Sequence, residues 1–129
     1  MYDIGIVGCG VIGNRLAAAI DAHDRYALAA ACDLDAERAA SLATEHGTES
    51  TATTTDHTEL VERDGLDAVY VGVPPLAHET VVADALDAGR HVICEKPIAA
   101  DAEAGARMTA RAAESDLATA VNLPFRYTP

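Results

Sequence analysis

A glycine-rich turn near the amino terminus constrains the fold more than any other feature of the sequence. The turn reads Gly8-Cys9-Gly10-Val11-Ile12-Gly13 and lies between an apolar segment at 2–7 and an alanine-rich segment that begins at 14. At this spacing, Gly8 permits a tight turn, Gly10 lets an anion approach the backbone closely, and Gly13 lets a helix pack against the strand. The turn therefore predicts a doubly wound α/β fold with an anion-binding loop at a helix N-terminus.

Apolar runs alternate with amphipathic stretches along the rest of the chain, which is typical of a parallel sheet covered by helices. We expect one domain over residues 1–129, built on a Rossmann-type, doubly wound, mostly parallel six-stranded sheet with helices on both faces. The strands are expected at about 2–7, 26–32, 50–53, 67–72, 90–94 and 118–122, and the helices at about 12–22, 35–46, 57–63, 76–88 and 101–115.

Several helix ends carry a chemical signal. Pro75 suits the first turn of a helix, where its missing N–H costs nothing, and Gly89 suits the left-handed residue after a helix. Asp101 is expected to be the N-cap of the last helix. Asp56 followed by Glu59 resembles a capping box, in which each residue bonds to the backbone N–H of the other.

The end of the second strand should carry an acidic residue, about twenty residues after the glycine turn. Asp33 follows 26–32 and meets this expectation, so we predict a strand at 26–32 although its alanines favour helix. The Asp33 carboxylate can accept hydrogen bonds from the adenosine ribose hydroxyls of a dinucleotide and repel a 2′-phosphate, which favours NAD over NADP. Arg38 nearby leaves NADP open, and a cap for the helix at 35–46 is the other interpretation of Asp33.

The composition argues against several other functions. Aspartate and glutamate total 21 and the formal net charge is −12, so neither nucleic acid nor an anionic membrane is an expected partner. The chain has no run of about 18 apolar residues and no basic segment before its first apolar run, so we expect neither a membrane span nor a signal peptide. Cys9, Cys32 and Cys94 have no metal-ligand spacing, which indicates buried thiols in a reducing cytoplasm and no metal site. The acidity with few lysines resembles the surface of proteins from salt-loving microbes.

Two later segments bring polar residues to the ends of apolar strands. Residues 67–78 run from a strand into a proline-started helix, and residues 89–97 take a second strand to a stop at Glu95-Lys96-Pro97. Ligands bind at the carboxyl ends of parallel strands, and a residue before proline stays extended, so Lys96 is expected to face the crevice. Lys96 is also the single lysine among nine basic residues, where a plain surface charge could have been arginine. An exposed charge at a turn is the alternative interpretation.

With these segments, the chain resembles the Gfo/Idh/MocA family (glucose–fructose oxidoreductase/inositol dehydrogenase). The resemblance rests on the glycine turn, Asp33, the PPLAH segment at 74–78 and, most specifically, the GRHVICEKP segment at 89–97, and it extends over the closing residues 122–129. Members of this family oxidise or reduce a hydroxyl-bearing carbon, usually on a sugar, cyclitol or related compound, with NAD or NADP. The resemblance therefore implies an oxidoreductase that takes a small polyol-like or sugar-like substrate.

The resemblance also implies roles for individual residues. Lys96 corresponds to the catalytic lysine, and the Lys96–Pro97 peptide is expected to be cis. For His78, an ordinary position in a first helical turn is the alternative. The implied cofactor-binding residues are Gly8, Gly10, Val11, Ile12, Gly13 and Asp33 on the adenosine diphosphate half, and Gly72, Val73, Pro74, His78, Glu95 and Lys96 on the nicotinamide side.

Two departures from the family pattern matter. Val73 stands where many members have threonine, which removes one hydroxyl near the cofactor. The family also continues into a sheet domain that binds substrate and supplies an aspartate and a histidine for acid–base chemistry, and that domain is absent from residues 1–129. We therefore expect this chain to need the second domain for turnover, and any homo-oligomer to form in the full-length protein. A stand-alone NAD(H)-binding or scaffold module without catalysis is the alternative.

Overall fold

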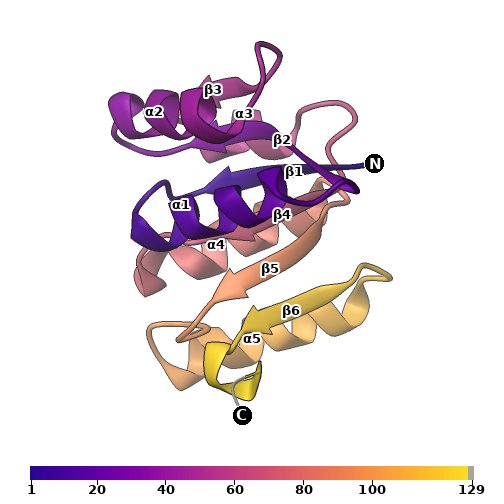
Figure 1. Cartoon of the computed structure of the whole chain (residues 1–129). Coiled ribbons are helices and arrows are strands. Elements are labelled where there is room, and N and C mark those ends of the chain that lie inside the picture. Colours follow the sequence, from indigo (N-terminus) through magenta and orange to yellow (C-terminus); the bar gives the residue numbers. More distant parts are fainter. Residues whose placement is uncertain (128–129) are drawn as a thin grey trace.

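The structure is a computed structural model, and it describes residues 1–127. Within them the chain forms one sheet of six strands in the order β3-β2-β1-β4-β5-β6, each parallel to its neighbours (Figure 1). The strands are β1 (Tyr2–Val7), β2 (Tyr26–Cys32), β3 (Ala52–Thr54), β4 (Ala68–Val71), β5 (His91–Glu95) and β6 (Thr119–Asn122). The helices are α1 (Val11–Asp21), α2 (Ala36–His46), α3 (His57–Val61), α4 (Pro75–Asp87) and α5 (Ala102–Glu114), followed by a 3₁₀ turn at Pro124–Tyr127.

This architecture confirms the predicted fold and each predicted element, with boundaries that differ by up to two residues. The strand at 26–32 forms as expected, because β2 pairs along its length with β1 and also with β3. Ala30 and Ala31 are buried in the sheet, so tertiary pairing overrides the helix preference of alanine there. The closing residues 128–129, which formed part of the family resemblance, lie outside the described residues.

Most helix-end predictions are also confirmed. Pro75 opens α4, Gly89 has a φ of +76°, and the Asp101 carboxylate accepts a hydrogen bond from the N–H of Ala104 at 2.8 Å. The capping box is wrong in both of its bonds, although Asp56 is the N-cap of α3. Its carboxylate accepts the N–H of Thr58 at 2.9 Å instead of that of Glu59, and its own N–H donates to the Thr54 hydroxyl, which also donates to the Glu59 carboxylate. The Thr54 hydroxyl at the end of β3 thus bonds to the Asp56 N–H and to the Glu59 carboxylate, the two groups that a capping box would have joined directly.

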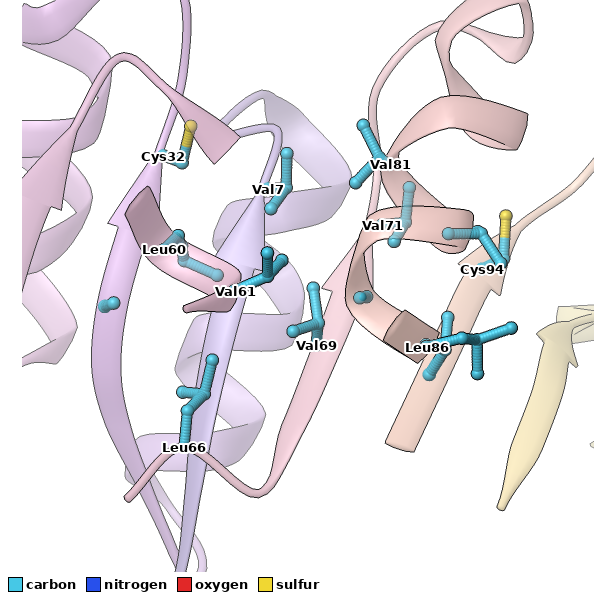
Figure 2. Packing of buried hydrophobic residues seen from close by; sticks show 14 of the residues in the cluster. Val7, Cys32, Leu60, Val61, Leu66, Val69, Val71, Val81, Leu86 and Cys94 are labelled. Atoms are coloured by element: carbon cyan, nitrogen blue, oxygen red, sulfur yellow. The ribbon is translucent and has the colours of Figure 1, made fainter. Parts of the chain in front are cut away.

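Two apolar cores lie on opposite faces of the sheet, because alternate strand residues point to opposite faces. One core packs β-strand side chains such as Val69 and Val71 against α3 and α4 (Figure 2). Met108 of α5 belongs to the same core. The other packs Ile6 and Tyr70 against α1 and α2. Each buried Val, Leu or Ile side chain contributes roughly 1.5–3 kcal/mol, so the two cores hold the strand ends in a fixed register.

The strand order reverses between β1 and β4, where ligands of doubly wound proteins bind. The carboxyl ends of these two strands meet because Val7 and Val71 are paired in the sheet. The loops after β2, β1, β4 and β5 therefore emerge along one edge, in that order. Among residues 1–127, no helix has the length and apolar character of a transmembrane span.

Candidate functional site

The glycine turn after β1 packs too tightly to accept side chains at two of its glycines. Gly8 has a φ of +102°, and a Cβ built there would lie 2.5 Å from the carbonyl group of Gly72. A Cβ on Gly13 would lie 2.1 Å from the carbonyl oxygen of Gly8. Gly10 differs, because a Cβ built on it would meet no atom within 4 Å. Close packing thus explains Gly8 and Gly13, while Gly10 faces open space.

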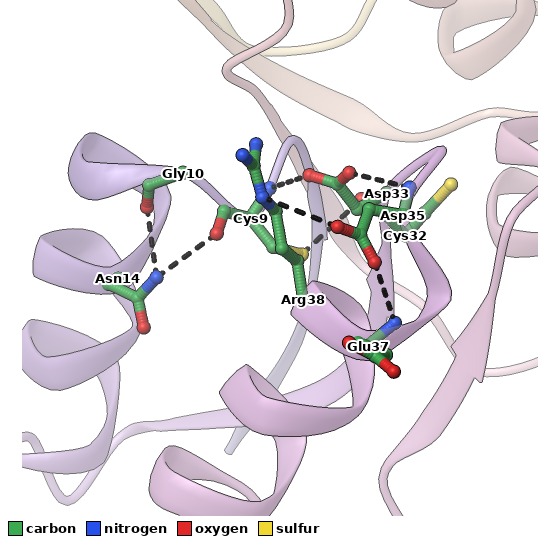
Figure 3. Close-up of polar contacts among 8 residues, drawn as sticks. All are labelled: Cys9, Gly10, Asn14, Cys32, Asp33, Asp35, Glu37 and Arg38. Carbon is green, nitrogen blue, oxygen red and sulfur yellow. Dashed lines mark hydrogen bonds and ion pairs between the residues drawn. The ribbon is translucent and has the colours of Figure 1, made fainter.

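The N-terminus of α1 has backbone N–H groups to offer to a ligand. Helix α1 begins at Val11 with Gly10 as its N-cap, and no side chain caps it. The Asn14 amide donates to the carbonyl oxygens of Cys9 at 3.1 Å and Gly10 at 2.9 Å, which occupies the acceptors of the loop (Figure 3). The first N–H groups of a helix have no intrahelical acceptor and lie at the positive end of its dipole. This loop can therefore bind an anion such as a diphosphate.

Asp33 lies beside this loop, at the carboxyl end of β2. Its carboxylate accepts the N–H of Cys9 at 2.8 Å with one oxygen and the N–H of Asp35 at 2.9 Å with the other (Figure 3). Asp35, not Asp33, is the N-cap of α2, since its carboxylate accepts the N–H of Glu37 at 3.0 Å. The interpretation of Asp33 as that helix cap is therefore wrong. Each carboxylate oxygen can accept a further hydrogen bond, so Asp33 can also hold two hydroxyl groups.

Arg38 and two cysteines lie near Asp33. The Arg38 guanidinium lies 3.7 Å from the Asp35 carboxylate on the exposed surface. Burial and the nearby charge of Asp33 raise the pKa of Cys9 to about 12 and that of Cys32 to about 11. Both thiols stay protonated at neutral pH, which agrees with their prediction as buried, unreactive side chains. Within residues 1–127, no three His, Cys, Asp or Glu side chains gather as metal ligands.

The loop after β4 lies directly against the glycine turn. The N–H of Gly72 donates to the carbonyl of Val7 at 2.7 Å, which holds this loop beside the end of β1. Val73 is half-buried, and Pro74 is the exposed N-cap of α4. Gly72 itself can carry no side chain, because a Cβ would lie 2.6 Å from the ring of Tyr70. These residues lie next to the glycine turn at the point where the strand order reverses, which is where doubly wound proteins bind their ligands.

His78 is buried beneath this loop. Its side chain is 1% exposed, with Nε2 2.6 Å from the carbonyl oxygen of Val73 and Nδ1 3.0 Å from that of Ile98. The Cys94 sulfur lies 3.4 Å from Nδ1. The imidazole thus ties the loop after β4 to the loop after β5, and a direct contact with a cofactor stays a prediction.

Glu95, Lys96 and Pro97 end β5 on the same edge as the glycine turn. Strands β2 and β5 are three positions apart in the sheet, so about 14 Å separates Asp33 from Lys96 along this edge. Lys96 is exposed, and the Lys96–Pro97 peptide is cis as expected. The sheet therefore brings every loop that the sequence singled out to one edge, with Asp33 towards one end of that edge and Lys96 towards the other.

Sequence reasoning missed two residues at this edge. The Tyr70 hydroxyl from β4 donates to the Glu95 carboxylate at 2.8 Å, and the Asn122 amide from β6 donates to the same oxygen at 2.5 Å. The available signal was weak: Tyr70 is a polar side chain inside an apolar strand, and Asn122 ends the last one. Their meeting depends on the strand order, which the sequence pattern did not specify.

The chain is similar in sequence to known oxidoreductases. A family model described as "Oxidoreductase family, NAD-binding Rossmann fold" matches residues 2–123. The chain is 33% identical over 127 residues to the dTDP-3,4-didehydro-2,6-dideoxy-alpha-D-glucose 3-reductase of Actinomadura kijaniata. That alignment covers 98% of this chain and 37% of the reductase, so the chain spans little more than a third of this relative.

Solved structures agree with that match. The 3-ketoreductase KijD10 of Actinomadura kijaniata, in complex with NADP and TDP-benzene, superposes with a TM-score of 0.89 at 31% identity, over 99% of this chain and 39% of that one. The scyllo-inositol dehydrogenase of Lactobacillus casei, with bound NAD(H) and scyllo-inositol, gives a TM-score of 0.90 at 29% identity, over 99% and 38%.

Proposed function

The chain belongs to the Gfo/Idh/MocA oxidoreductase family, which has an NAD-binding Rossmann fold, and from this premise we propose that it holds the dinucleotide for a hydride-transfer enzyme. The proposed reaction transfers a hydride between a nicotinamide cofactor and a hydroxyl-bearing carbon of a sugar, cyclitol or similar compound. The similarity to a sugar 3-reductase and to an inositol dehydrogenase supports this substrate class. Residues 1–129 form the nucleotide-binding domain in this proposal, and a second domain contributes the substrate contacts.

The observation that carries this proposal is that the loops after β2, β1, β4 and β5 share one edge of the sheet. The uncapped N-terminus of α1 and the open space at Gly10 suit a diphosphate, and the Asp33 carboxylate beside them suits the adenosine ribose. We assign the adenosine diphosphate half to Gly8, Gly10, Val11, Ile12, Gly13 and Asp33. We assign the nicotinamide half to Gly72, Val73, Pro74, Glu95 and Lys96, with His78 supporting the loop from inside.

The proposed cofactor is NAD, with NADP as the alternative, since relatives are known with each of them. The Asp33 carboxylate would repel a 2′-phosphate, and its oxygens are fixed in place by two backbone N–H groups. Titrating the chain with NADH and with NADPH, followed by nicotinamide fluorescence, should give a lower Kd for NADH. Replacing Asp33 by Asn should narrow the difference between the two dissociation constants. Tighter binding of NADPH by the unaltered chain would contradict the assignment.

Lys96 is the proposed catalytic residue. The nicotinamide, when bound, supplies or accepts the hydride. Lys96 would hydrogen-bond the reacting oxygen and stabilise its charge as the hydroxyl proton leaves. An ammonium group suits this task because it is a compact donor at the exposed end of β5.

Substitution of Lys96 tests the proposal in the full-length protein. Lys96→Met should lower kcat by at least about 100-fold and change the Kd for NADH far less, because the side chain stabilises charge on the substrate oxygen in the transition state and makes only one of several contacts on the nicotinamide side. Lys96→Arg separates charge from geometry, since it keeps the positive charge but not the compact ammonium group. Its kcat should also fall. Unchanged kcat in Lys96→Met would remove the catalytic role. A chain that binds NADH but supports no turnover in any full-length form would favour a binding or scaffold module.

The net charge and the cysteines bear on the cellular compartment and the partners of the protein. We infer a cytoplasmic protein with an acidic surface, supported by the net charge of −12 and by three buried free cysteines. The same charge disfavours nucleic acid and anionic membranes as partners. Homo-oligomer formation is proposed only for the full-length protein.

A further inference from the structure

Three donors from three parts of the chain converge on the Glu95 carboxylate. Tyr70 on β4 and Asn122 on β6 donate to one of its oxygens, at 2.8 and 2.5 Å. The backbone N–H of Lys96 donates to the other oxygen at 3.2 Å. Glu95 and Asn122 are paired in the sheet, so this cluster joins β4, β5 and β6 at their carboxyl ends.

The Tyr70 side chain is built into this arrangement. It is 1% exposed in the core beneath α1 and α2, and its ring lies so close to Gly72 that a Cβ there would be 2.6 Å away. Burial, together with the hydrogen bond to Glu95 and its charge, raises the pKa of Tyr70. The hydroxyl therefore remains a donor at physiological pH, and a buried tyrosine hydroxyl of this kind needs its acceptor.

The backbone of Lys96, and not its side chain, is bonded to this cluster. Among the hydrogen bonds and ion pairs of residues 1–127 none involves the Lys96 ammonium, so its backbone N–H is its link to the fold at this point. On one side of Lys96, the backbone N–H bonds to Glu95. On the other side, Pro97 has no N–H to offer, and the carbonyl of Ile98 meets the His78 ring at 3.0 Å.

We propose that Tyr70 and Asn122 are positioning residues for Lys96, acting through the Glu95 carboxylate. Two neighbouring strands hold the carboxylate, the carboxylate holds the backbone N–H of Lys96, and the backbone fixes the point at the end of β5 from which the amine extends. The functional part of this inference rests on the proposed role of Lys96. Its structural part stands on the contacts alone, and the two can be tested separately.

The structural test uses the fact that Lys96 is the single lysine of the chain. Labelling the 129-residue chain with ¹⁵N-lysine gives one backbone amide signal, which reports directly on the bond to Glu95. Tyr70→Phe and Asn122→Ala should each shift this signal and speed its exchange with solvent. Tyr26→Phe is the matched control, because it removes a tyrosine hydroxyl from an exposed position at the opposite end of the sheet. An amide signal that both Tyr70→Phe and Asn122→Ala leave in place would overturn the proposal.

The functional test compares turnover in the full-length protein. Tyr70→Phe and Asn122→Ala should each lower kcat by at least about tenfold with KM for the dinucleotide within about twofold, since a small displacement of a catalytic group is costly. The double variant should lose no more than Glu95→Gln, because all three changes act through one carboxylate. Asn122→Ala removes an amide at the sheet edge, so it remains informative if Tyr70→Phe fails to fold. Full kcat in both single variants, with Lys96→Met inactive, would refute the positioning role and leave the proposed function standing; an active Lys96→Met would refute the function itself.

Discussion

Gly10→Ala separates the folding of the glycine turn from its use as a binding site. Gly10 has a φ of −79° and a ψ of −160°, which alanine adopts without strain, and a Cβ there meets no atom within 4 Å. The cost of alanine at an N-cap, about 0.5 kcal/mol relative to glycine, is offset by a gain of about 0.4–1 kcal/mol from the less flexible unfolded chain. We therefore expect the free energy of unfolding to change by less than about 0.5 kcal/mol.

Binding should respond very differently to Gly10→Ala. If a diphosphate rests against this backbone, the added methyl group lies in its path, and overpacking of this kind costs about 1–3 kcal/mol. That cost corresponds to a Kd for NADH about 5- to 150-fold higher. Fluorescence titration measures the affinity, and urea denaturation of the same sample measures the stability.

Two other glycines serve as controls. Gly13→Ala should lower the free energy of unfolding by about 2 kcal/mol, because a contact of 2.1 Å with a backbone oxygen outweighs the helix preference for alanine. Gly105→Ala in α5 should raise it by about 1 kcal/mol without affecting binding, because its nearest neighbours lie at 3.6 and 3.8 Å. If Gly10→Ala bound NADH as tightly as the unaltered chain, the diphosphate could not lie where we place it.

Two further predictions concern buried groups. His78→Leu should lower the free energy of unfolding by about 1–3 kcal/mol, because the imidazole N–H is lost to the buried carbonyl of Val73 or Ile98 that accepts it; an unchanged urea midpoint would show that these contacts contribute nothing. The three cysteines have a raised pKa of about 11 to 12 against an ordinary value of 9.0, so the folded chain retains protons that the unfolded chain loses. Stability should therefore fall as pH rises from about 9 towards 12, and stability that rose with pH over this window, measured by urea midpoints, would contradict the burial argument.

Local patterns predicted the fold because they reflect local physics. The glycine spacing, the alternation of apolar runs and the proline and aspartate signals each act within a few residues of where they occur. The Tyr26–Cys32 strand could be predicted only by requiring an acid at its end, since its alanines favour helix. The capping box of Asp56 and Glu59 was predicted wrongly because the pattern considers only those two residues. The Thr54 hydroxyl precedes the helix and takes both the Asp56 N–H and the Glu59 carboxylate as partners.

The sequence predicted where the residues of the candidate site lie in the sheet, but not which side chains contact each other. Asp33 and Lys96 could be placed at strand ends, and parallel strands bring those ends to one edge. The partners of Glu95 could not be predicted, because Tyr70 and Asn122 reach it only through the order β4-β5-β6 and the pairing register. The burial of His78 was hidden for the same reason, since its partner Ile98 follows the next strand along the chain.

Asp33 has a consequence for anyone who wishes to exchange the coenzyme of this protein. The carboxylate that would discriminate against a 2′-phosphate also fastens the turn after β1 to the turn after β2, through the N–H groups of Cys9 and Asp35. In the proposed assignment, selectivity and local rigidity therefore depend on one side chain. A single substitution that admits NADPH should also loosen both turns, and a successful redesign must supply new acceptors for the two amides that it releases.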